Sequence, residues 1–233
     1  MRFLPLSALL ALHLLASALA QADTETSSRI SWIQSRLDGA SSTANYWQYG
    51  WTAFYGVTTV AYASQADSLD APDEQHDRVD AKVGAVSSLL GLGGMFLDPL
   101  TTGSNAKALA ALPQDSEAAQ TQKLQQAERM LRQNAEQEQN ARSTQAHVLA
   151  AVVSVLSGVA VARDDHRNDD GAMVALQSLL VGELQIYTAP TDATKAWEDY
   201  QRNGWQQAGR SGNGDGGWLV GVGPQVVEVS YRF

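Results

Sequence analysis

Glu183 is the side chain in this sequence whose surroundings most strongly suggest chemistry. It stands within an apolar segment, where an unpaired carboxylate is costly, and Gln185 and Tyr187 follow it closely. This arrangement predicts a site inside a helix bundle that binds a cation, a proton or a polar ligand group. The alternative is a carboxylate at the membrane surface, or one paired with Lys or Arg near the helix end.

Two acidic turns bring imidazole and carboxylate groups close together along the chain. One holds His76 and Asp77, and the other holds Asp165 and His166. These ligands suit divalent metal ions, so the turns predict a metal site if the fold brings them to one end of a bundle. Neither turn has a spacing specific to one metal, and a short acidic turn is usually only solvated.

Composition excludes several classes of function. The chain has no Cys, which rules out thiolate metal sites, Cys nucleophiles and disulfides together. The net charge of −9 argues against a nucleic-acid partner, because phosphate binding needs clustered Lys and Arg. The sequence contains no phosphate loop and no Gly-x-Ser-x-Gly elbow, so we predict neither enzyme activity nor a cofactor.

The first twenty residues, 1–20, have the pattern of a secretory signal peptide. Arg2 supplies the positive start, Leu4 to Ala16 the short apolar stretch, and Ala18-Leu19-Ala20 the small-x-small cleavage pattern. Cleavage after Ala20 or Ala22 fits this pattern. We therefore predict Sec-type export into a bacterial-type cell envelope. The alternative, an uncleaved anchor helix, needs a longer apolar stretch.

The remaining chain divides by composition. Residues 21–45 are polar, residues 46–200 contain the apolar segments, and residues 201–233 form a Gly-rich and then strand-like tail with a turn at Gly223-Pro224. A narrow apolar stripe predicts a polar linking helix over 114–142, with Asp115 or Ser116 as its cap. The expected fold class is mainly α. The four apolar segments are 39–66, 83–97, 144–162 and 171–187.

Comparing the chain with itself predicts an internal repeat. At a constant offset of 90 residues, His76 and Asp80 align with His166 and Asp170, and four apolar or small residues after them also match. The chain then holds two copies of one helical hairpin, 46–100 and 144–190, which pack together as a four-helix arrangement. Chance similarity between two small-residue-rich helices is the alternative.

Features of the sequence conflict on whether these helices lie in a membrane. The first and third apolar segments are long enough for a bilayer, which needs about 20 apolar residues, but the second and fourth are short. The mean hydropathy of −0.22 is low for four spans. Export would place the Lys- and Arg-containing 103–142 linker outside the cytoplasm, against the positive-inside tendency. We favour the inner membrane, with a soluble periplasmic bundle as the alternative.

The stretch from Val181 to Pro190 resembles a motif in a group of uncharacterised bacterial proteins. Like them, this chain has a signal-like start, an aromatic-rich first apolar segment from Tyr46 to Tyr55, and a Ser-Leu-Leu-Gly stretch from Ser88 to Gly91. The resemblance covers residues 45–200. The resemblance implies membrane helices of unknown role, and it implies no activity. The mean hydropathy of this chain is lower than such membrane helices would give.

These observations together predict a non-enzymatic structural or interaction protein of the cell envelope. Its expected partners are the lipid bilayer and either another envelope protein or a second copy of the chain. The alternative function is binding or transport of a small molecule or ion within the helix bundle, through Glu183.

Overall fold

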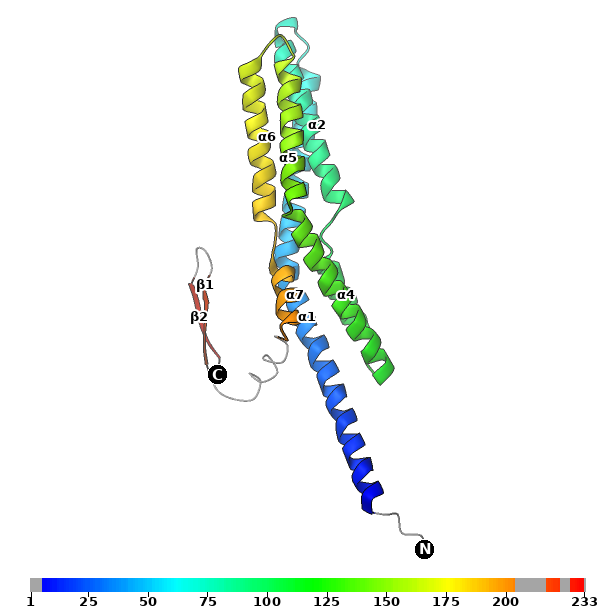
Figure 1. Cartoon of the computed structure of the whole chain (residues 1–233). Coiled ribbons are helices and arrows are strands. Elements are labelled where there is room, and N and C mark those ends of the chain that lie inside the picture. The colour runs from blue at the N-terminus through cyan, green and yellow to red at the C-terminus, as the bar shows by residue number, and fades with distance from the viewer. Residues whose placement is uncertain (1–5, 204–216, 223–226, 233) are drawn as a thin grey trace. The chain divides into compact units, whose positions relative to one another are not determined.

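A computed structural model describes the backbone of residues 6–203, 217–222 and 227–232, and the side chains of residues 24–203. The protein is mainly helical, as predicted (Figure 1). Its elements in chain order are α1 (Leu6–Ser68), the short 3-10 helix η1 (Pro72–Glu74), α2 (Gln75–Leu97), α3 (Thr102–Ala111), α4 (Glu117–Ala141), α5 (Thr144–Ala162), α6 (Asn168–Thr188), α7 (Asp192–Gln201), β1 (Gly217–Val222) and β2 (Val227–Arg232).

The chain forms two compact units. The helical unit comprises residues 33–197, and the terminal unit comprises residues 1–32 and 198–233. In the terminal unit Arg29 Nε donates a hydrogen bond of 2.8 Å to the Tyr200 hydroxyl, and the Trp32 and Tyr200 ring centroids are 5.8 Å apart. These contacts hold the end of α7 against α1 within this unit.

Two strands of the tail pair as an antiparallel sheet. β1 pairs with β2 in a register that places Gly217 opposite Arg232 and Val222 opposite Val227. The predicted turn at Gly223-Pro224 lies outside the described residues.

The helical unit contains the predicted four-helix arrangement, made of the second half of α1 with α2, α5 and α6. Figure 1 shows α2, α5 and α6 running side by side. α5 and α6 approach most closely: a methyl group at Gly158 would lie 2.5 Å from the Gly171 carbonyl oxygen, and one at Gly182 would lie 2.9 Å from Ala150 Cβ. Small residues permit this backbone contact, as they do in membrane helix pairs.

The first two bundle helices meet through aromatic rings placed on glycines. The Tyr62 ring covers Gly84, where an added methyl group would lie 2.9 Å from the ring, and the Tyr55 ring covers Gly91 at 2.5 Å. Both tyrosines and both glycines are seven residues apart, which is two helical turns. The antiparallel helices α1 and α2 therefore pack with the same ring-on-glycine contact at two levels.

The polar linking helix is confirmed as α4, with Ser116 as its cap: Ser116 Oγ accepts a hydrogen bond from Ala119 N. The buried Glu138 of α4 accepts hydrogen bonds of 3.1 and 2.8 Å from the Ala193 and Thr194 backbone amides at the start of α7. Arg142 donates to the Tyr187 and Ala189 carbonyls at the end of α6. Each charge has the sign that the facing helix end favours.

Three features of the fold differ from expectation. The polar segment 21–45 does not end before the bundle, because α1 continues through it, and its only Gly, Gly39, does not break the helix. α3 was not predicted. His76 and Asp77, expected in an acidic turn, lie instead in the first turn of α2, which starts at Gln75.

The α5–α6 contact makes a prediction about packing. Gly158→Ala should lower the free energy of unfolding by about 1–3 kcal/mol, because the added methyl group meets the Gly171 carbonyl with no room to move. Gly56→Ala in α1 is the matched control, since nothing lies within 4 Å of its added methyl group and Ala favours helix. Unfolding of the detergent-solubilised protein measures both, and equal stability of the two variants would contradict the packing.

Glu138 makes a second prediction. Burial raises the pKa of Glu138, against the opposing hydrogen bonds from Thr194 and Ala193. A carboxyl whose pKa is higher in the folded than in the unfolded state binds its proton more tightly when folded, so its contribution to stability falls as pH rises above the ordinary value of 4.5. Glu138→Gln should remove this pH-dependent loss, as measured by unfolding between about pH 4 and pH 7.

A truncation separates the charge of Glu138 from its acceptor role. Glu138→Ala should cost about 1–3 kcal/mol, because two buried backbone amides lose their acceptor. Glu136→Ala, which removes an exposed carboxylate paired with Arg132 on the same helix, should cost less than about 1 kcal/mol. A smaller loss for Glu138→Ala than for Glu136→Ala would show that the cap does not hold α7.

Candidate functional site

The four-helix bundle carries most of its large apolar side chains on the outside. Its buried positions in α5 and α6 are mostly small or hydroxyl residues, among them Ser154, Ser157 and Gly158 of α5 and Gly171 of α6. This is the reverse of a protein in water, where the large apolar residues are buried. The exposed apolar residues of the four helices include Val57 and Val60, Leu89, Leu90 and Phe96, Val152, Val155 and Leu156, and Leu176, Leu180 and Leu184.

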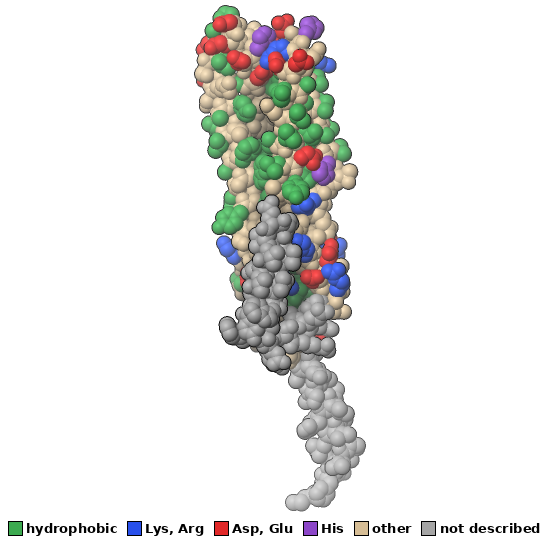
Figure 2. All heavy atoms as spheres, turned by 90° about the vertical axis from the view of Figure 1, so that its left-hand side faces the viewer, with side chains coloured by type: hydrophobic (Ala, Val, Ile, Leu, Met, Phe, Trp, Pro, Cys, Tyr) green, Lys and Arg blue, Asp and Glu red, His purple; other side chains and the backbone are tan. Residues whose placement is uncertain are grey.

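Charged residues bound this apolar surface at both ends. Figure 2 shows a mainly green band below a charged end with several acidic side chains, with further Lys, Arg, Asp and Glu beneath it. α5 has 19 residues and crosses the band, so the band is about 28 Å tall at 1.5 Å per residue. The hydrocarbon core of a bilayer is about 30 Å thick.

Three segments of the described chain contain helices long and apolar enough to cross a membrane, namely Pro72–Ala111, Glu117–Ala162 and Asn168–Gln201. They include α2, α5 and α6. The expectation that the second and fourth apolar segments are too short was therefore wrong: α2 and α6 have 23 and 21 residues because each helix extends beyond its apolar run. The first segment, in α1, is not among the three, and its Tyr, Trp, Gln and Thr residues lower its hydropathy.

The rest of the helical unit has the opposite pattern. Ile33 and Leu37 of α1, Leu109 of α3 and Leu131 of α4 are fully buried, whereas α4 exposes glutamines and charged residues. This part therefore has an apolar core and a polar surface, as expected for packing in water. The helical unit therefore combines a bundle with an apolar surface and a second part with a polar surface.

Glu183 lies on the α5–α6 seam, where it pairs with His147 of α5. The Glu183 carboxylate is 2.8 Å from His147 Nδ1, and the two side chains are 41% and 48% exposed. A carboxylate paired near the helix end is closer to this geometry than a site inside the bundle, but the partner is His147 and not Lys or Arg. His147 completes the pair, and its position in the first turn of α5 gave no sign of it.

The three predicted ligand-binding residues do not converge on one point. Gln185 turns into the bundle, where its amide oxygen accepts a 2.6 Å hydrogen bond from the Tyr55 hydroxyl and its amide nitrogen lies 3.1 Å from Met95 Sδ. Tyr187 is 77% exposed. Residues two apart on a helix point about 200° away from each other, so Gln185 faces away from both neighbours.

The structure brings the two acidic turns to the same end of the bundle. His76 Nδ1 is 2.9 Å from Asp164 Oδ2, and His76 Nε2 is 3.8 Å from Asp165 Oδ2. Asp77 and His166 do not join this contact within the described residues. No group of three or more His, Asp or Glu side chains in the described chain is placed to hold a metal ion. The metal site therefore stays a prediction, with only His76 and Asp165 brought near each other.

Arg167 is the central cation of this end, and the sequence did not single it out. Its guanidinium binds both Asp80 carboxylate oxygens, at 3.0 and 2.8 Å, and Asp170 at 2.8 Å, and lies 3.7 Å from Asp164. The Asp80 hydrogen bonds raise the pKa of Arg167 further, so it stays charged. Asp80 is on α2 and the other two carboxylates flank the α5–α6 turn, so Arg167 joins the two hairpins.

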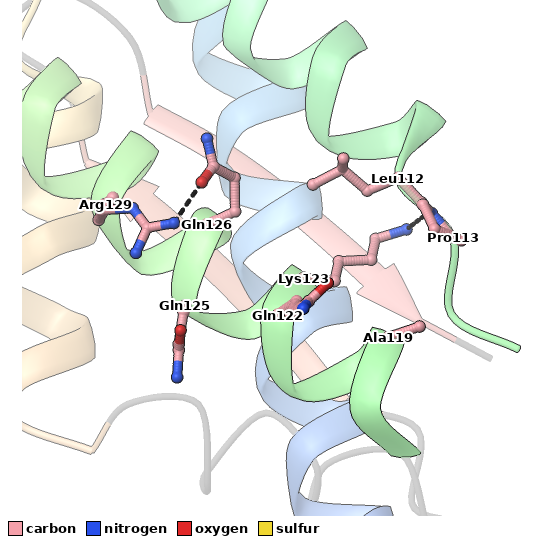
Figure 3. Close-up of a pocket in the computed structure, with 8 residues that line it drawn as sticks. All are labelled: Leu112, Pro113, Ala119, Gln122, Lys123, Gln125, Gln126 and Arg129. Atoms are coloured by element: carbon pink, nitrogen blue, oxygen red, sulfur yellow. Dashed lines mark hydrogen bonds between the residues drawn. The ribbon is translucent and has the colours of Figure 1, made fainter. Parts of the chain in front are cut away.

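A shallow hollow lies between α4 and the chain that follows α3 (Figure 3). Lys123 projects from α4 toward Leu112, and its ammonium donates a 2.9 Å hydrogen bond to the Leu112 carbonyl at the end of α3. The buried ammonium thereby meets the partial negative charge of a helix C-terminus. Lys123 thus caps α3, and the hollow offers no second charged group that converges with it.

Comparison of the chain with protein-family models, with curated proteins and with solved structures gave no match. The resemblance to uncharacterised bacterial membrane proteins stays a prediction.

The Glu183–His147 pair makes a prediction about its surroundings. A double-mutant cycle with Glu183→Gln and His147→Asn should give a coupling free energy above that of the Arg132–Glu136 pair on α4, which is expected at about 0.3–0.5 kcal/mol. The reason is that Glu183 and His147 lie among apolar side chains, which screen charge less than water does. Equal coupling for the two pairs would mean that water surrounds both.

Proposed function

We propose that this chain is a non-enzymatic integral protein of the cell envelope, with a structural or interaction role. The observation that carries the proposal is the reversed polarity of the bundle, which has most of its large apolar residues outside, whereas the buried positions of α5 and α6 are mostly small or hydroxyl residues. Lipid chains can cover an apolar surface of this kind, whereas its exposure to water costs free energy. The height of the apolar band, set by α5, supports the same conclusion.

In this proposal α1, α2, α5 and α6 lie in the inner membrane, and α3 and α4 lie in water on one side. The continuous helix α1 then passes from the water-suited part into the bundle without a break. Tyr46, Tyr49 and Tyr187 are exposed near the end of the band that adjoins α4. Exposed Tyr residues suit the headgroup region of a bilayer, where their rings meet lipid and their hydroxyls meet water.

Extraction of the membrane fraction tests the proposal directly. The tagged protein should resist alkaline carbonate and come free only with detergent, since its apolar band would need lipid or detergent around it. Release by carbonate, or recovery in the periplasmic fraction, would favour the soluble bundle. In that case the apolar band would need a protein partner or a second copy.

The absence of Cys makes topology measurable with single substitutions. If a signal peptide is cleaved, Gln125→Cys on α4 should react with a membrane-impermeant maleimide in spheroplasts. Asp73→Cys in the acidic end should react only after the membrane is opened. The unsubstituted chain is the control and should not react. The reverse pattern would mean that the N-terminus is retained on the cytoplasmic side.

Ligand binding through Glu183 is the second candidate function. The pair with His147 supports it, because a carboxylate and an imidazole that lie half exposed in an apolar band can exchange a proton or bind a polar group. Gln185 points into the bundle, away from Glu183, which weakens it, and Tyr187 follows Glu183 by about one helical turn but is 77% exposed. Transport or binding that is lost in Glu183→Gln and kept in the Glu136→Gln control would support this candidate over a purely structural role.

A further inference from the structure

Helix α6 has two unlike faces. The face inside the bundle carries Gly171 and Gly182, which lie against α5, and Gln185, which accepts the hydrogen bond from Tyr55. The outer face carries a line of large side chains that we call the α6 stripe: Met173, Leu176, Leu180, Glu183 and Tyr187. The Glu183 side chain is 41% exposed, and the other four residues are between 52% and 77% exposed. The α6 stripe therefore faces away from the bundle.

The members of the α6 stripe are spaced as in a helix that packs along a second helix. They are three, four, three and four residues apart, which is the a/d spacing of a coiled coil. From Met173 to Tyr187 the stripe is about 21 Å long at 1.5 Å per residue. The spacing alone does not identify an interface, because α5 exposes a second line with the same spacing. This α5 stripe consists of Val148, Val152, Val155 and Val159.

Glu183 distinguishes the α6 stripe from the α5 stripe. In the four apolar segments 39–66, 83–97, 144–162 and 171–187 it is the one Asp, Glu, Lys or Arg. Lipid chains are as apolar as Val, so a wholly apolar stripe gains little from a neighbouring helix, whereas polar side chains hydrogen-bond across membrane helices. An ionisable side chain at membrane depth almost always faces protein or a water-filled cavity. The α6 stripe is therefore the face that a protein partner should cover.

The pair of Glu183 and His147 is complementary to a copy of itself. His147 Nδ1 lies 2.8 Å from the Glu183 carboxylate, and within the described residues its Nε2 atom has no hydrogen-bond partner. An imidazole with both nitrogens protonated can donate to two carboxylates, and a carboxylate can accept several hydrogen bonds. A two-fold axis beside the pair places each His147 next to Glu183 of the other copy. The two copies then complete a ring of alternating imidazoles and carboxylates, which a different protein could match only with groups of its own.

We propose that the α6 stripe is the interface of a parallel two-fold dimer in the membrane, with Glu183 and His147 as its polar layer. The inference rests on the proposed function, because a single orientation in a bilayer makes the two copies of α6 run parallel. The polar layer sets the register of the two helices, as one polar residue at an a position does in coiled coils. The α5 stripe stays against lipid.

Disulfide cross-linking in native membranes tests the interface, because the chain has no Cys of its own. Leu180→Cys puts a thiol in the α6 stripe. Val152→Cys puts one at the same level of the α5 stripe, since Ala150 of α5 lies against Gly182 of α6. With copper phenanthroline as the oxidant, Leu180→Cys should give a product of twice the chain mass, and Val152→Cys should give little. Equal products from the two variants would indicate random collision and overturn the proposal.

Two tags on the same chain identify the partner. When copies of Leu180→Cys with different tags are expressed together, the cross-linked product should contain both tags. A product of another mass that contains one tag would mean that a different protein covers the α6 stripe. That result would overturn the second copy as its occupant.

Substitution of Glu183 tests the polar layer in the Leu180→Cys background. Glu183→Leu should lower the cross-linked fraction by about 3- to 10-fold, the effect of losing one hydrogen bond between membrane helices. Glu183→Gln can still donate and accept hydrogen bonds and should keep more of the product. Gln145→Leu, which removes an exposed polar side chain near the same end of α5, should leave the product unchanged. An undiminished product in Glu183→Leu would overturn the role of the polar layer.

Met173→Cys and carbonate extraction separate failure of the dimer from failure of membrane residence. Parallel copies of α6 bring equal positions together along the whole stripe, so Met173→Cys should give the same product as Leu180→Cys. A product from Leu180→Cys alone would mean that the stripes pair antiparallel, which overturns the parallel dimer. If the chain resists carbonate and neither variant gives a product, the dimer is wrong and the membrane proposal stands. If carbonate releases the chain, both proposals are wrong.

Discussion

Close contact between the backbones of α5 and α6 sets most of the character of this protein. Gly158 and Gly171 leave no space between the two helices for a side chain, so most of the larger apolar residues of both helices point outward, with Val161 and Ile186 as buried exceptions. An apolar exterior then needs an apolar environment or a partner to cover it. The reversed polarity of the bundle thus follows from the positions of a few small residues, and membrane residence is the inference that accounts for it.

α4 connects the bundle to the part that is built for water. Its Lys123 caps the end of α3, its Glu138 caps the start of α7, and Arg142 at its own end caps α6. Asn134 and Gln137 of α4 accept hydrogen bonds from Thr101 before the first turn of α3. A helix that looks from its sequence like a solvated linker therefore satisfies the end groups of three other helices, which would otherwise lack partners.

The sequence predicted the helices better than the contacts between them. The apolar segment 83–97 correctly marked the end of α2 at Leu97, where Asp98 before Pro99 disfavours helix. The short α3 carried no clear period and was missed. Glu183 and Gln185 were predicted to share a site because they are close in sequence. Helical geometry places Gln185 on the opposite face of α6 from Glu183. The partners His147 and Arg167 come from other elements, and spacing along one helix cannot reveal them.

In the fold, Lys and Arg residues are divided more evenly between the two ends of the bundle than the loop around 64–82 alone suggested. In the sequence, the loop around 64–82 carries only Arg78 and Lys82. The contact of Arg167 with Asp80 places the α5–α6 turn at the same end, so Arg163 and Arg167 count on that side too. The acidic end then holds four Lys and Arg residues against five in the 103–142 linker, and Asp and Glu contribute little to orientation. Charge therefore barely opposes a topology that places this acidic end in the cytoplasm.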